Sequence, residues 1–320
     1  MMVQTYSGGS PALKKMSGMI SKFQGVILGA AVGDALTAPV QFLSRDEIRD
    51  QYVEIREMLG GGWLRLRPGQ FSDDTQMMIC VLESILEEGT FDVDRAAMKL
   101  LQWYKTKPKG IGNTTVASFK RLSKGENWRT ASQKVYSKRL HSSAGNGALV
   151  RSLPVALRYC SDSAALVTHS SNSAMMTHAD PIVTTGAVLL NLMISQLIQS
   201  DEKDPRAPSI EYLFGKKNNL WKNILDEIDY LGEEDLIASG FVVDTVQSAL
   251  WCFMKTGSLE EALITAVNRG EDVYALAAVT GALAGAHYGL EGIPTRWLDA
   301  LEHHEAMTAF ARRIYLLIRQ

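Results

Sequence analysis

The segment Ala275–Gly289 constrains the fold more than any other part of the chain, because it consists almost wholly of Ala, Gly, Leu, Val and Thr. Side chains this small let the backbones of neighbouring helices approach closely. We therefore expect a central helix here, with its first turn held rigidly. A carboxylate at that turn, such as Asp272, is well placed to share an ion with the acidic pair Asp73 and Asp74.

Helical periodicity dominates the rest of the chain, and strand-like alternation is nearly absent. The predicted helices, joined by Gly, Pro, Ser and Asn turns, are 15–35, 74–88, 92–105, 113–122, 129–136, 145–158, 162–170, 180–199, 218–228, 240–255, 258–268, 274–287 and 294–317. This pattern predicts an all-α protein, a compact orthogonal multi-helix bundle. We expect a flexible N-terminal extension over residues 1–20, a single domain over 21–320, and a polar surface loop over 200–217.

Composition narrows the classes of function. The chain has 320 residues, 46% of them hydrophobic, and a formal net charge of −2. That charge, with a pI near 6.3, argues against a nucleic-acid surface, so we expect no basic stripe. Apolar runs are interrupted before the roughly 18 residues that a membrane span needs, and no signal peptide is evident. Cys80, Cys160 and Cys252 are odd in number and widely spaced, which fits reduced thiols in the cytoplasm.

The run Phe71–Met77 places two adjacent carboxylates and two hydroxyls directly before an apolar helix that ends at Gly89. One interpretation is a helix cap, because Ser72 or Asp73 is a good N-cap and acids in a first turn suit the helix dipole. The other is a site for a hard cation, because Mg²⁺ prefers oxygen ligands. Taken alone, the run favours the cap.

Two further segments have the character of anion sites. Ile111-Gly112-Asn113-Thr114 and Ser143-Ala144-Gly145-Asn146-Gly147 each bring glycine and small polar residues to the start of a predicted helix, where backbone N–H groups are free. The ordinary alternative for both is a Gly-Asn turn with a helix cap. His178 precedes a long apolar helix, where a lone histidine is more often a cap or core partner than a catalyst. Phe241 is an aromatic at helical spacing, which is by default a core residue.

The order of these motifs carries more information than any one of them. The seven blocks are FQGVILGAAVGDALTAPVQF (23–42), GGGWLRLRPGQFSDDTQM (60–77), IGNTT (111–115), SSAGNGALVRSLPVAL (142–157), MTHADP (176–181), GFVVDTVQSALWCF (240–253) and GEDVYALAAVTGALAGAHYG (270–289). In this order and at these intervals the chain resembles the ADP-ribosylglycohydrolase family over roughly residues 23–315. The resemblance implies the same all-α fold.

The resemblance also implies roles for the polar residues. Ser72, Asp73, Asp74 and Asp272 match the family's metal ligands for one or two Mg²⁺ ions, and Asp73 or Asp74 would guide the attacking water. The segment that begins at Ile111 would help to hold the diphosphate and ribose, and the segment that begins at Ser143 would lie at the ligand cleft. His178 would act behind the residues that touch the ligand, and Phe241 would stack on adenine.

Four positions depart from the family pattern. Gln41 stands where many members carry Glu, Gly110 where members that act on ADP-ribosylarginine often carry Asp, and Tyr274 and Ala275 where the family signature has Asp and Thr. An amide cannot take a proton from water at neutral pH, a phenol is a poor replacement for a carboxylate, and a methyl group cannot bind a metal ion. These changes predict a weakened Mg²⁺ site.

Two hypotheses about function follow. The first is an impaired hydrolase that retains binding to an ADP-ribosylated protein, in the manner of an immunity protein that neutralises an ADP-ribosyltransferase. Under this hypothesis the partners are the ADP-ribose moiety of a modified protein or the transferase itself, and residues 1–20 would be a docking arm. The second is an active Mg²⁺-dependent enzyme that cleaves the N-glycosidic bond of ADP-ribosylarginine.

Overall fold

The computed structural model describes residues 11–139, 143–215, 217 and 219–319, and within these residues it is built from α-helices with no β-strand. The α-helices are α1 (Pro11–Leu36), α2 (Arg45–Tyr52), α3 (Asp73–Glu88), α4 (Val93–Lys105), α5 (Asn113–Leu122), α6 (Trp128–Lys138), α7 (Leu149–Arg158), α8 (Ser163–Met175), α9 (Pro181–Gln199), α10 (Arg206–Phe214), α11 (Leu220–Glu227), α12 (Val242–Lys255), α13 (Leu259–Val267), α14 (Tyr274–Tyr288), α15 (Thr295–Ala300) and α16 (His304–Leu317). Three short 3₁₀ turns are η1 (Ile228–Tyr230), η2 (Glu233–Asp235) and η3 (Leu290–Gly292). The predicted all-α class is confirmed.

Helices α1 and α14 form the centre of the bundle and run antiparallel. Three pairs of positions meet backbone to backbone along their contact: Gly25 with Gly285, Gly29 with Gly281, and Gly33 with Ala277. A Cβ atom built on any of the three α1 glycines would overlap a carbonyl oxygen of α14. The small residues are therefore required because the two backbones touch, and the prediction of a central helix is confirmed.

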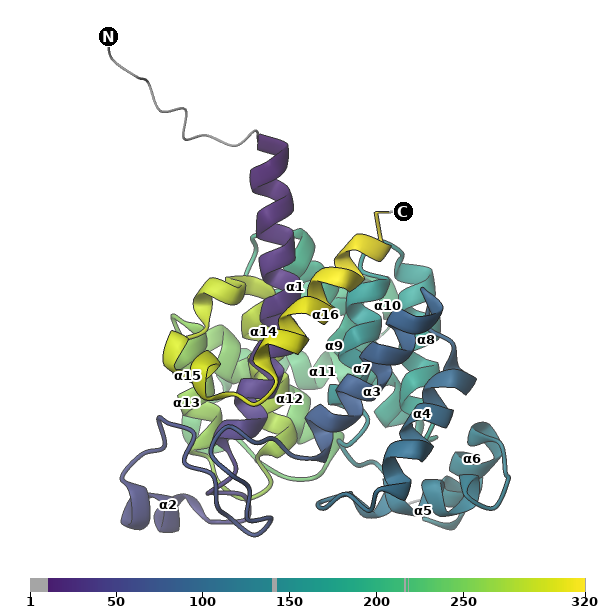
Figure 1. The fold of residues 1–320 in the computed structure, drawn as a ribbon. Coiled ribbons are helices and arrows are strands. Elements are labelled where there is room, and N and C mark those ends of the chain that lie inside the picture. The colour runs from purple at the N-terminus through teal and green to yellow at the C-terminus, as the bar shows by residue number, and fades with distance from the viewer. Residues whose placement is uncertain (1–10, 140–142, 216, 218, 320) are drawn as a thin grey trace.

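The other helices surround this pair (Figure 1). Helix α14 also packs against α12, α13, α9 and α7, while α1 packs against α16. Every residue of α14 from Tyr274 to Ala286 is buried. Because the first turn of α14 is clamped on several sides, it is a rigid wall for the pocket that lies in front of it.

The ends of α3 follow the predicted signals. The Ser72 hydroxyl caps α3 by accepting the N–H of Asp74 at 3.2 Å, and Gly89 ends the helix in the left-handed conformation (φ 72°). The cap interpretation is therefore correct, and it is compatible with the site described below, because the two carboxylates that follow the cap face a cavity.

Three regions differ from the predictions. The capping box of Ser44 and Glu47 starts α2, a helix that the periodicity analysis missed. Residues 206–214 of the expected loop form α10, which is anchored because Arg206 pairs with Asp204 and Asp229. The helix expected over 294–317 is broken between α15 and α16, where His303 takes a positive φ of 62°.

Helix α1 begins at Pro11, inside the segment for which we expected a flexible extension, and residues 1–10 lie outside the described residues. Two helical segments, Lys15–Leu36 and Pro181–Gln199, are long and apolar enough to cross a membrane by length and composition alone, contrary to the expected interruption of apolar runs. Within the fold 78% and 72% of the most apolar 18-residue stretch of each are buried, so packing against neighbouring helices accounts for their apolar character.

Candidate functional site

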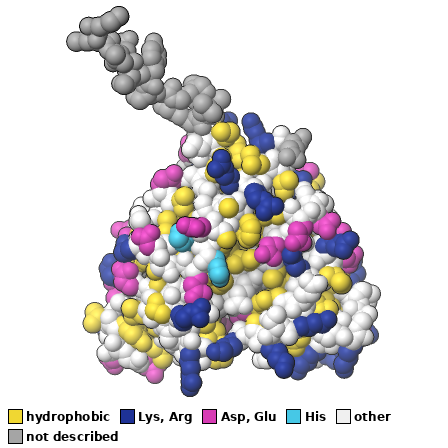
Figure 2. Space-filling model, in the orientation of Figure 1, with side chains coloured by type: hydrophobic (Ala, Val, Ile, Leu, Met, Phe, Trp, Pro, Cys, Tyr) yellow, Lys and Arg dark blue, Asp and Glu magenta, His cyan; other side chains and the backbone are white. Residues whose placement is uncertain are grey.

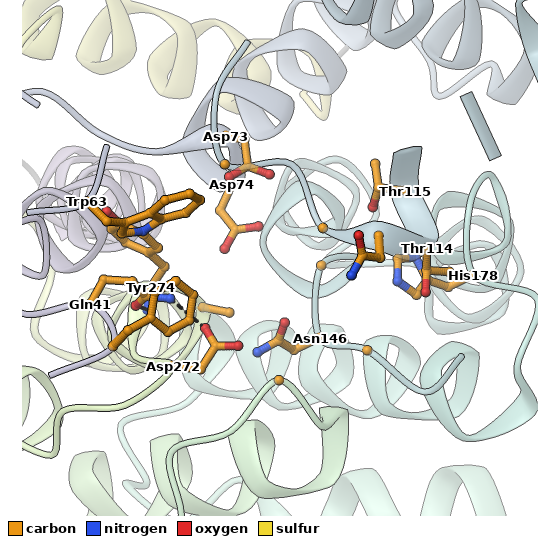
Figure 3. Close-up of a pocket in the computed structure, with 18 residues that line it drawn as sticks. Gln41, Trp63, Asp73, Asp74, Thr114, Thr115, Asn146, His178, Asp272 and Tyr274 are labelled. Atoms are coloured by element: carbon orange, nitrogen blue, oxygen red, sulfur yellow. Dashed lines mark hydrogen bonds between the residues drawn. The ribbon is translucent and has the colours of Figure 1, made fainter. Parts of the chain in front are cut away.

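A cavity of about 320 Å³ lies where the N-termini of α3, α5 and α14 converge (Figure 3). Its walls come from segments far apart in the sequence. The lining residues are Gln41, Phe42, Trp63, Asp73, Asp74, Gly110, Gly112, Asn113, Thr114, Thr115, Gly145, Asn146, Gly147, His178, Gly240, Asp272, Tyr274 and Ala275.

Most of the site residues predicted from the sequence line this cavity, including all four altered positions. Four predicted residues do not. Ser72 lies behind the carboxylates as the cap of α3, and the Ser143 hydroxyl donates to Asp180 Oδ2 at 2.9 Å. Ile111 is half-buried beside the lining residues. Phe241 is 40% exposed and forms a backbone bridge with Gly145, so it lies next to the cavity. Its stacking on adenine stays a prediction.

Asp73 and Asp74 sit at the N-terminus of α3, across the cavity from Asp272 (Figure 3). They are held there by Asp34, a fully buried carboxylate that accepts the backbone N–H groups of Ser72 at 3.0 Å and Thr75 at 3.1 Å, and the Thr75 hydroxyl at 2.6 Å. Asp34 was missed by the sequence analysis. The available signal was a single acid inside the apolar run that became α1.

The carboxylates perturb one another. Burial, followed by the negative charge of Asp34, raises the pKa of Asp73 to about 7. Burial and the charge of Asp73 raise the pKa of Asp74 well above its usual value, while the Arg151 guanidinium acts in the opposite direction. Repulsion of this kind is relieved when a cation joins the group.

The donor set fits one hard cation. Asp73, Asp74 and Asp272 offer carboxylate oxygens, the chemistry that Mg²⁺ prefers. Within the described part of the chain, however, no three His, Cys, Asp or Glu side chains already stand in the arrangement of a metal site. The predicted separation of their carboxyl groups stays a prediction.

Gln41 ties the loop after α1 to the first turn of α14. Its Oε1 accepts the backbone N–H groups of Val273 at 2.9 Å and Tyr274 at 3.0 Å, and its Nε2 donates to Asp272 Oδ1 at 2.7 Å (Figure 3). The bond to Asp272 needs an amide, since a glutamate could accept the two backbone N–H groups but would set a carboxylate oxygen against the carboxylate of Asp272. The amide therefore holds Asp272 without any cation.

Tyr274 lies beside the clamp that the three hydrogen bonds of Gln41 form between the loop after α1 and the first turn of α14. Among the described residues its buried hydroxyl meets no partner in hydrogen-bond geometry; burial, followed by the charges of Asp34, Asp73 and Asp74, raises its pKa more than the neighbouring Trp63 lowers it. The phenol therefore stays neutral across the physiological range. Ala275 next to it adds only a methyl group. Neither residue supplies the anionic or hydroxyl ligand that the family pattern has at these positions.

Gly110 lies where any other residue would be strained. Its φ of +89° favours glycine, and a Cβ atom built there would lie 2.9 Å from Asp73 Oδ1 and 3.1 Å from Leu64 Cδ1. The glycine therefore lets the loop before α5 pack against the carboxylate of Asp73, whereas the Asp that the resemblance leads us to expect here would bring a second carboxylate against it.

His178 is positioned by a buried relay. Arg151 Nη2 donates to Thr177 Oγ1 at 2.6 Å, and Thr177 Oγ1 lies 2.8 Å from His178 Nδ1. Because a guanidinium can only donate, the Thr177 hydroxyl is free to give its own proton to Nδ1. In the tautomer whose Nδ1 accepts this bond, the imidazole proton is on Nε2, which faces the cavity beside Gly145. That tautomer presents a neutral N–H donor to a ligand.

Acid should destabilise the fold through His178. Burial, followed by the charge of Arg151, lowers its pKa to about 3, whereas an unfolded chain binds the proton near pH 6.5. Below that pH His178 binds a proton in the unfolded state but not in the folded state, so the free energy of unfolding falls as the pH drops. We expect a loss of about 2 kcal/mol from this group between pH 7.5 and pH 5. Urea denaturation of the wild type and His178→Gln at both pH values checks this, and equal losses in the two proteins would contradict it.

Two exposed aromatic residues at the cavity were also missed by the sequence analysis. Phe42 and Trp63 are 54% and 52% exposed, and their ring centroids lie 5.5 Å apart. Trp63 follows three glycines, Gly60–Gly62, all with positive φ, and this tight turn brings the indole to the cavity. The two rings, tilted by 49° to each other, provide an exposed apolar surface beside the polar walls.

The protein is an all-α bundle in which three acids face glycine-rich helix N-termini across one cavity. Comparisons with known proteins identify a family with which this class of fold and site agrees. The family model described as ADP-ribosylglycohydrolase matches residues 16–320. The chain therefore belongs to the ADP-ribosylglycohydrolase family.

Particular relatives match most of its length. The chain is 35% identical over 278 residues to the ADP-ribosyl-[dinitrogen reductase] glycohydrolase of Rhodospirillum rubrum, covering 87% of this chain and 89% of that protein. It is 29% identical over 315 residues to the ADP-ribosylarginine hydrolase Tri1 of Serratia proteamaculans, covering 96% and 82%. A solved structure titled ADP-ribosylglycohydrolase-related protein complex superposes with a TM-score of 0.76 at 30% identity, covering 94% of this chain and 99% of that one.

Proposed function

We propose that this protein binds the ADP-ribosyl group of a modified protein arginine and hydrolyses it poorly. The observation that carries the proposal is Gln41, whose amide holds Asp272 and the first turn of α14 in the place of a carboxylate. The binding surfaces remain, because Gly112–Thr115 and Gly145–Gly147 still bring polar groups to the cavity. A site of this composition can recognise a ligand while lacking a general base at position 41.

Different walls of the cavity would contact different parts of the ligand. The free N–H groups at the start of α5 suit the negative charge of a diphosphate, and His178 adds a neutral donor on the same side of the cavity. Asp73 and Asp74, on the facing wall, would accept hydrogen bonds from ribose hydroxyls. A Mg²⁺ ion held by Asp73, Asp74 and Asp272 would orient the ribose and polarise the bond to the arginine.

Calorimetry with ADP-ribose tests the binding half of the proposal. Wild-type protein should bind ADP-ribose, and His178→Ala should weaken binding about 10-fold or more, because a hydrogen bond to a charged group contributes ~1.5–3 kcal/mol. His169→Ala is the matched control, since His169 stacks on Tyr159 and does not line the cavity. Absence of binding in the wild type, or equal weakening in the two variants, would refute this half.

An active hydrolase is the second candidate, and the retained pair Asp73 and Asp74 favours it. Both carboxylates face the cavity and could guide a water toward the anomeric carbon. Under this candidate, Asp73→Ala should abolish release of ADP-ribose from ADP-ribosylarginine. Under the preferred proposal there is little release to abolish.

A more specific version of the proposal is that the protein neutralises an ADP-ribosyltransferase by binding it. The first turns of α1 project from the body of the molecule (Figure 1), and Met16 on this projection is exposed. A partner could bury this end without disturbing the bundle. Met19, further along the expected docking arm, packs against the core and would not be available to a partner.

A further inference from the structure

One surface of the molecule has a strong positive charge, although the total charge of the chain is slightly negative. Residues 105–139, here called the basic lobe, contain ten Lys and Arg residues and one acid, Glu126. Their net charge is therefore +9, while the chain as a whole has −2, which leaves −11 for all other residues. The expectation of no basic stripe, drawn from the total charge, was wrong at this point. Opposite charges are segregated between the lobe and the rest of the chain.

The lobe comprises the end of α4, the loop that follows it, α5 and α6, and α5 packs against α6. Figure 2 shows Lys and Arg gathered at the lower right of the molecule, where Figure 1 places α5 and α6. Nine of the ten cations are exposed, and Arg121 is half-buried. Within the described residues, Glu126 pairs with Arg121 and Lys134, and no ion pair is formed by Lys105, Lys107, Lys109, Lys120, Lys124, Arg129, Lys138 or Arg139.

The basic lobe adjoins the cavity. Lys105, Lys107 and Lys109 lead directly into Gly110, Gly112 and the following wall residues. The ammonium of Lys109 donates to the backbone oxygen of Leu64 at 3.1 Å, next to the cavity residue Trp63. A macromolecule whose modified side chain enters the cavity must therefore come close to the lobe.

We propose that the basic lobe is the docking surface for the protein that carries the ADP-ribosyl group, and that this partner presents an acidic surface around its modified arginine. This inference rests on the proposed function for the choice of partner. Like charges gathered on one face steer an oppositely charged partner and reject a basic one. The lobe thus selects among modified proteins, while the cavity recognises the group that they share.

The aromatic residues of the lobe favour a protein partner over a single-stranded nucleic acid. Proteins that bind single strands combine a basic surface with exposed rings on which bases stack. In the lobe, Phe119 and Trp128 are buried and Tyr136 is half-buried. The described part of the lobe therefore offers charge without exposed rings of its own, and the exposed rings of Phe42 and Trp63 lie at the cavity and not along the lobe.

Peptides of matched length test the proposal. The probes are peptides of about 15 residues with a central ADP-ribosylarginine, flanked either by Glu or by Ser, together with the unmodified Glu peptide, free ADP-ribose and a single-stranded RNA of equal charge. The lobe variant is Lys120→Gln, Lys124→Gln and Lys138→Gln, three exposed lysines that do not line the cavity. The control removes the same charge from the far end of the molecule by Arg312→Gln, Arg313→Gln and Arg319→Gln.

The wild type should bind the modified acidic peptide about 10-fold or more tightly than the modified neutral peptide at low salt, and the preference should shrink as salt increases. The lobe variant should lose the preference, the control should keep it, and free ADP-ribose should bind all three proteins equally. If ADP-ribose bound none of the three proteins, the proposed function would be refuted. In that case the docking surface would still be supported if the unmodified acidic peptide bound in a salt-dependent way and only the lobe variant lost this binding. Equal binding of the acidic and neutral peptides, an unchanged preference in the lobe variant, or tighter binding of RNA than of the acidic peptide would overturn the inference.

Discussion

Gly29→Ala should reduce the free energy of unfolding by about 3 kcal/mol or more, the upper part of the range for overpacking a core. The added methyl group would overlap the carbonyl oxygen of Gly281. Because that oxygen belongs to a backbone clamped by several helices, no side chain can move aside to relieve the overlap. Helices α1 and α14 would have to separate, which also shifts the first turn of α14 and the clamp between Gln41 and Asp272.

Gly18→Ala is the matched control on the same helix, because a Cβ atom there meets nothing within 4 Å. This change should stabilise the protein by about 0.5–1 kcal/mol, since alanine restricts the unfolded chain and favours the helix. Urea denaturation of both variants measures the difference. A loss below about 1 kcal/mol for Gly29→Ala would show that the close contact of α1 and α14 is not essential.

Restoring the family residues at three positions should create a strong metal site. The triple variant combines Gln41→Glu, Tyr274→Asp and Ala275→Thr. It adds two carboxylates and a hydroxyl to the group formed by Asp73, Asp74 and Asp272. Without a cation these like charges repel, so the triple variant should be less stable than the wild type. Mg²⁺ should then stabilise it in a concentration-dependent way, because a ligand that binds only the folded state adds RT ln(1 + [Mg²⁺]/Kd).

We expect Mg²⁺ affinity to rise about 10–100-fold or more and hydrolysis of ADP-ribosylarginine to rise about 10²–10⁴-fold, the ranges for supporting a metal ligand and for supplying a general base. Calorimetry and thermal denaturation with added Mg²⁺ measure the first effect, and release of ADP-ribose measures the second. Tyr274→Phe is the control, because it removes the buried hydroxyl without adding a charge. Equal Mg²⁺ affinity in the wild type and the triple variant would contradict our account of positions 41, 274 and 275.

Local signals in the sequence were sufficient for the fold class, whereas most of the cavity residues were predicted from the resemblance that the seven motifs carry together. The small residues of Ala275–Gly289 predicted a central helix, and the carboxylates of Asp73, Asp74 and Asp272 do face one cavity. Both predictions depend on features that persist in any packing arrangement: residue size at a helix contact, and acids at helix starts.

Other features depended on contacts across the chain. Asp34 could not be assigned because its partners, Ser72 and Thr75, follow it by about forty residues. Gln41 was identified as a departure from the family, but its clamp on Asp272 requires two loops brought together by the α1–α14 pair. The basic lobe was visible in the sequence, but the balanced total charge concealed it.

Wild-type protein mixed with ADP-ribosylarginine and Mg²⁺ provides the most direct test of the central claim, with binding measured by calorimetry and free ADP-ribose measured in the same sample. Our account predicts saturable binding together with release at least about 10²-fold slower than in the triple variant. Release by the wild type at the rate of the triple variant, abolished by Asp73→Ala, would contradict it and identify the protein as a working hydrolase.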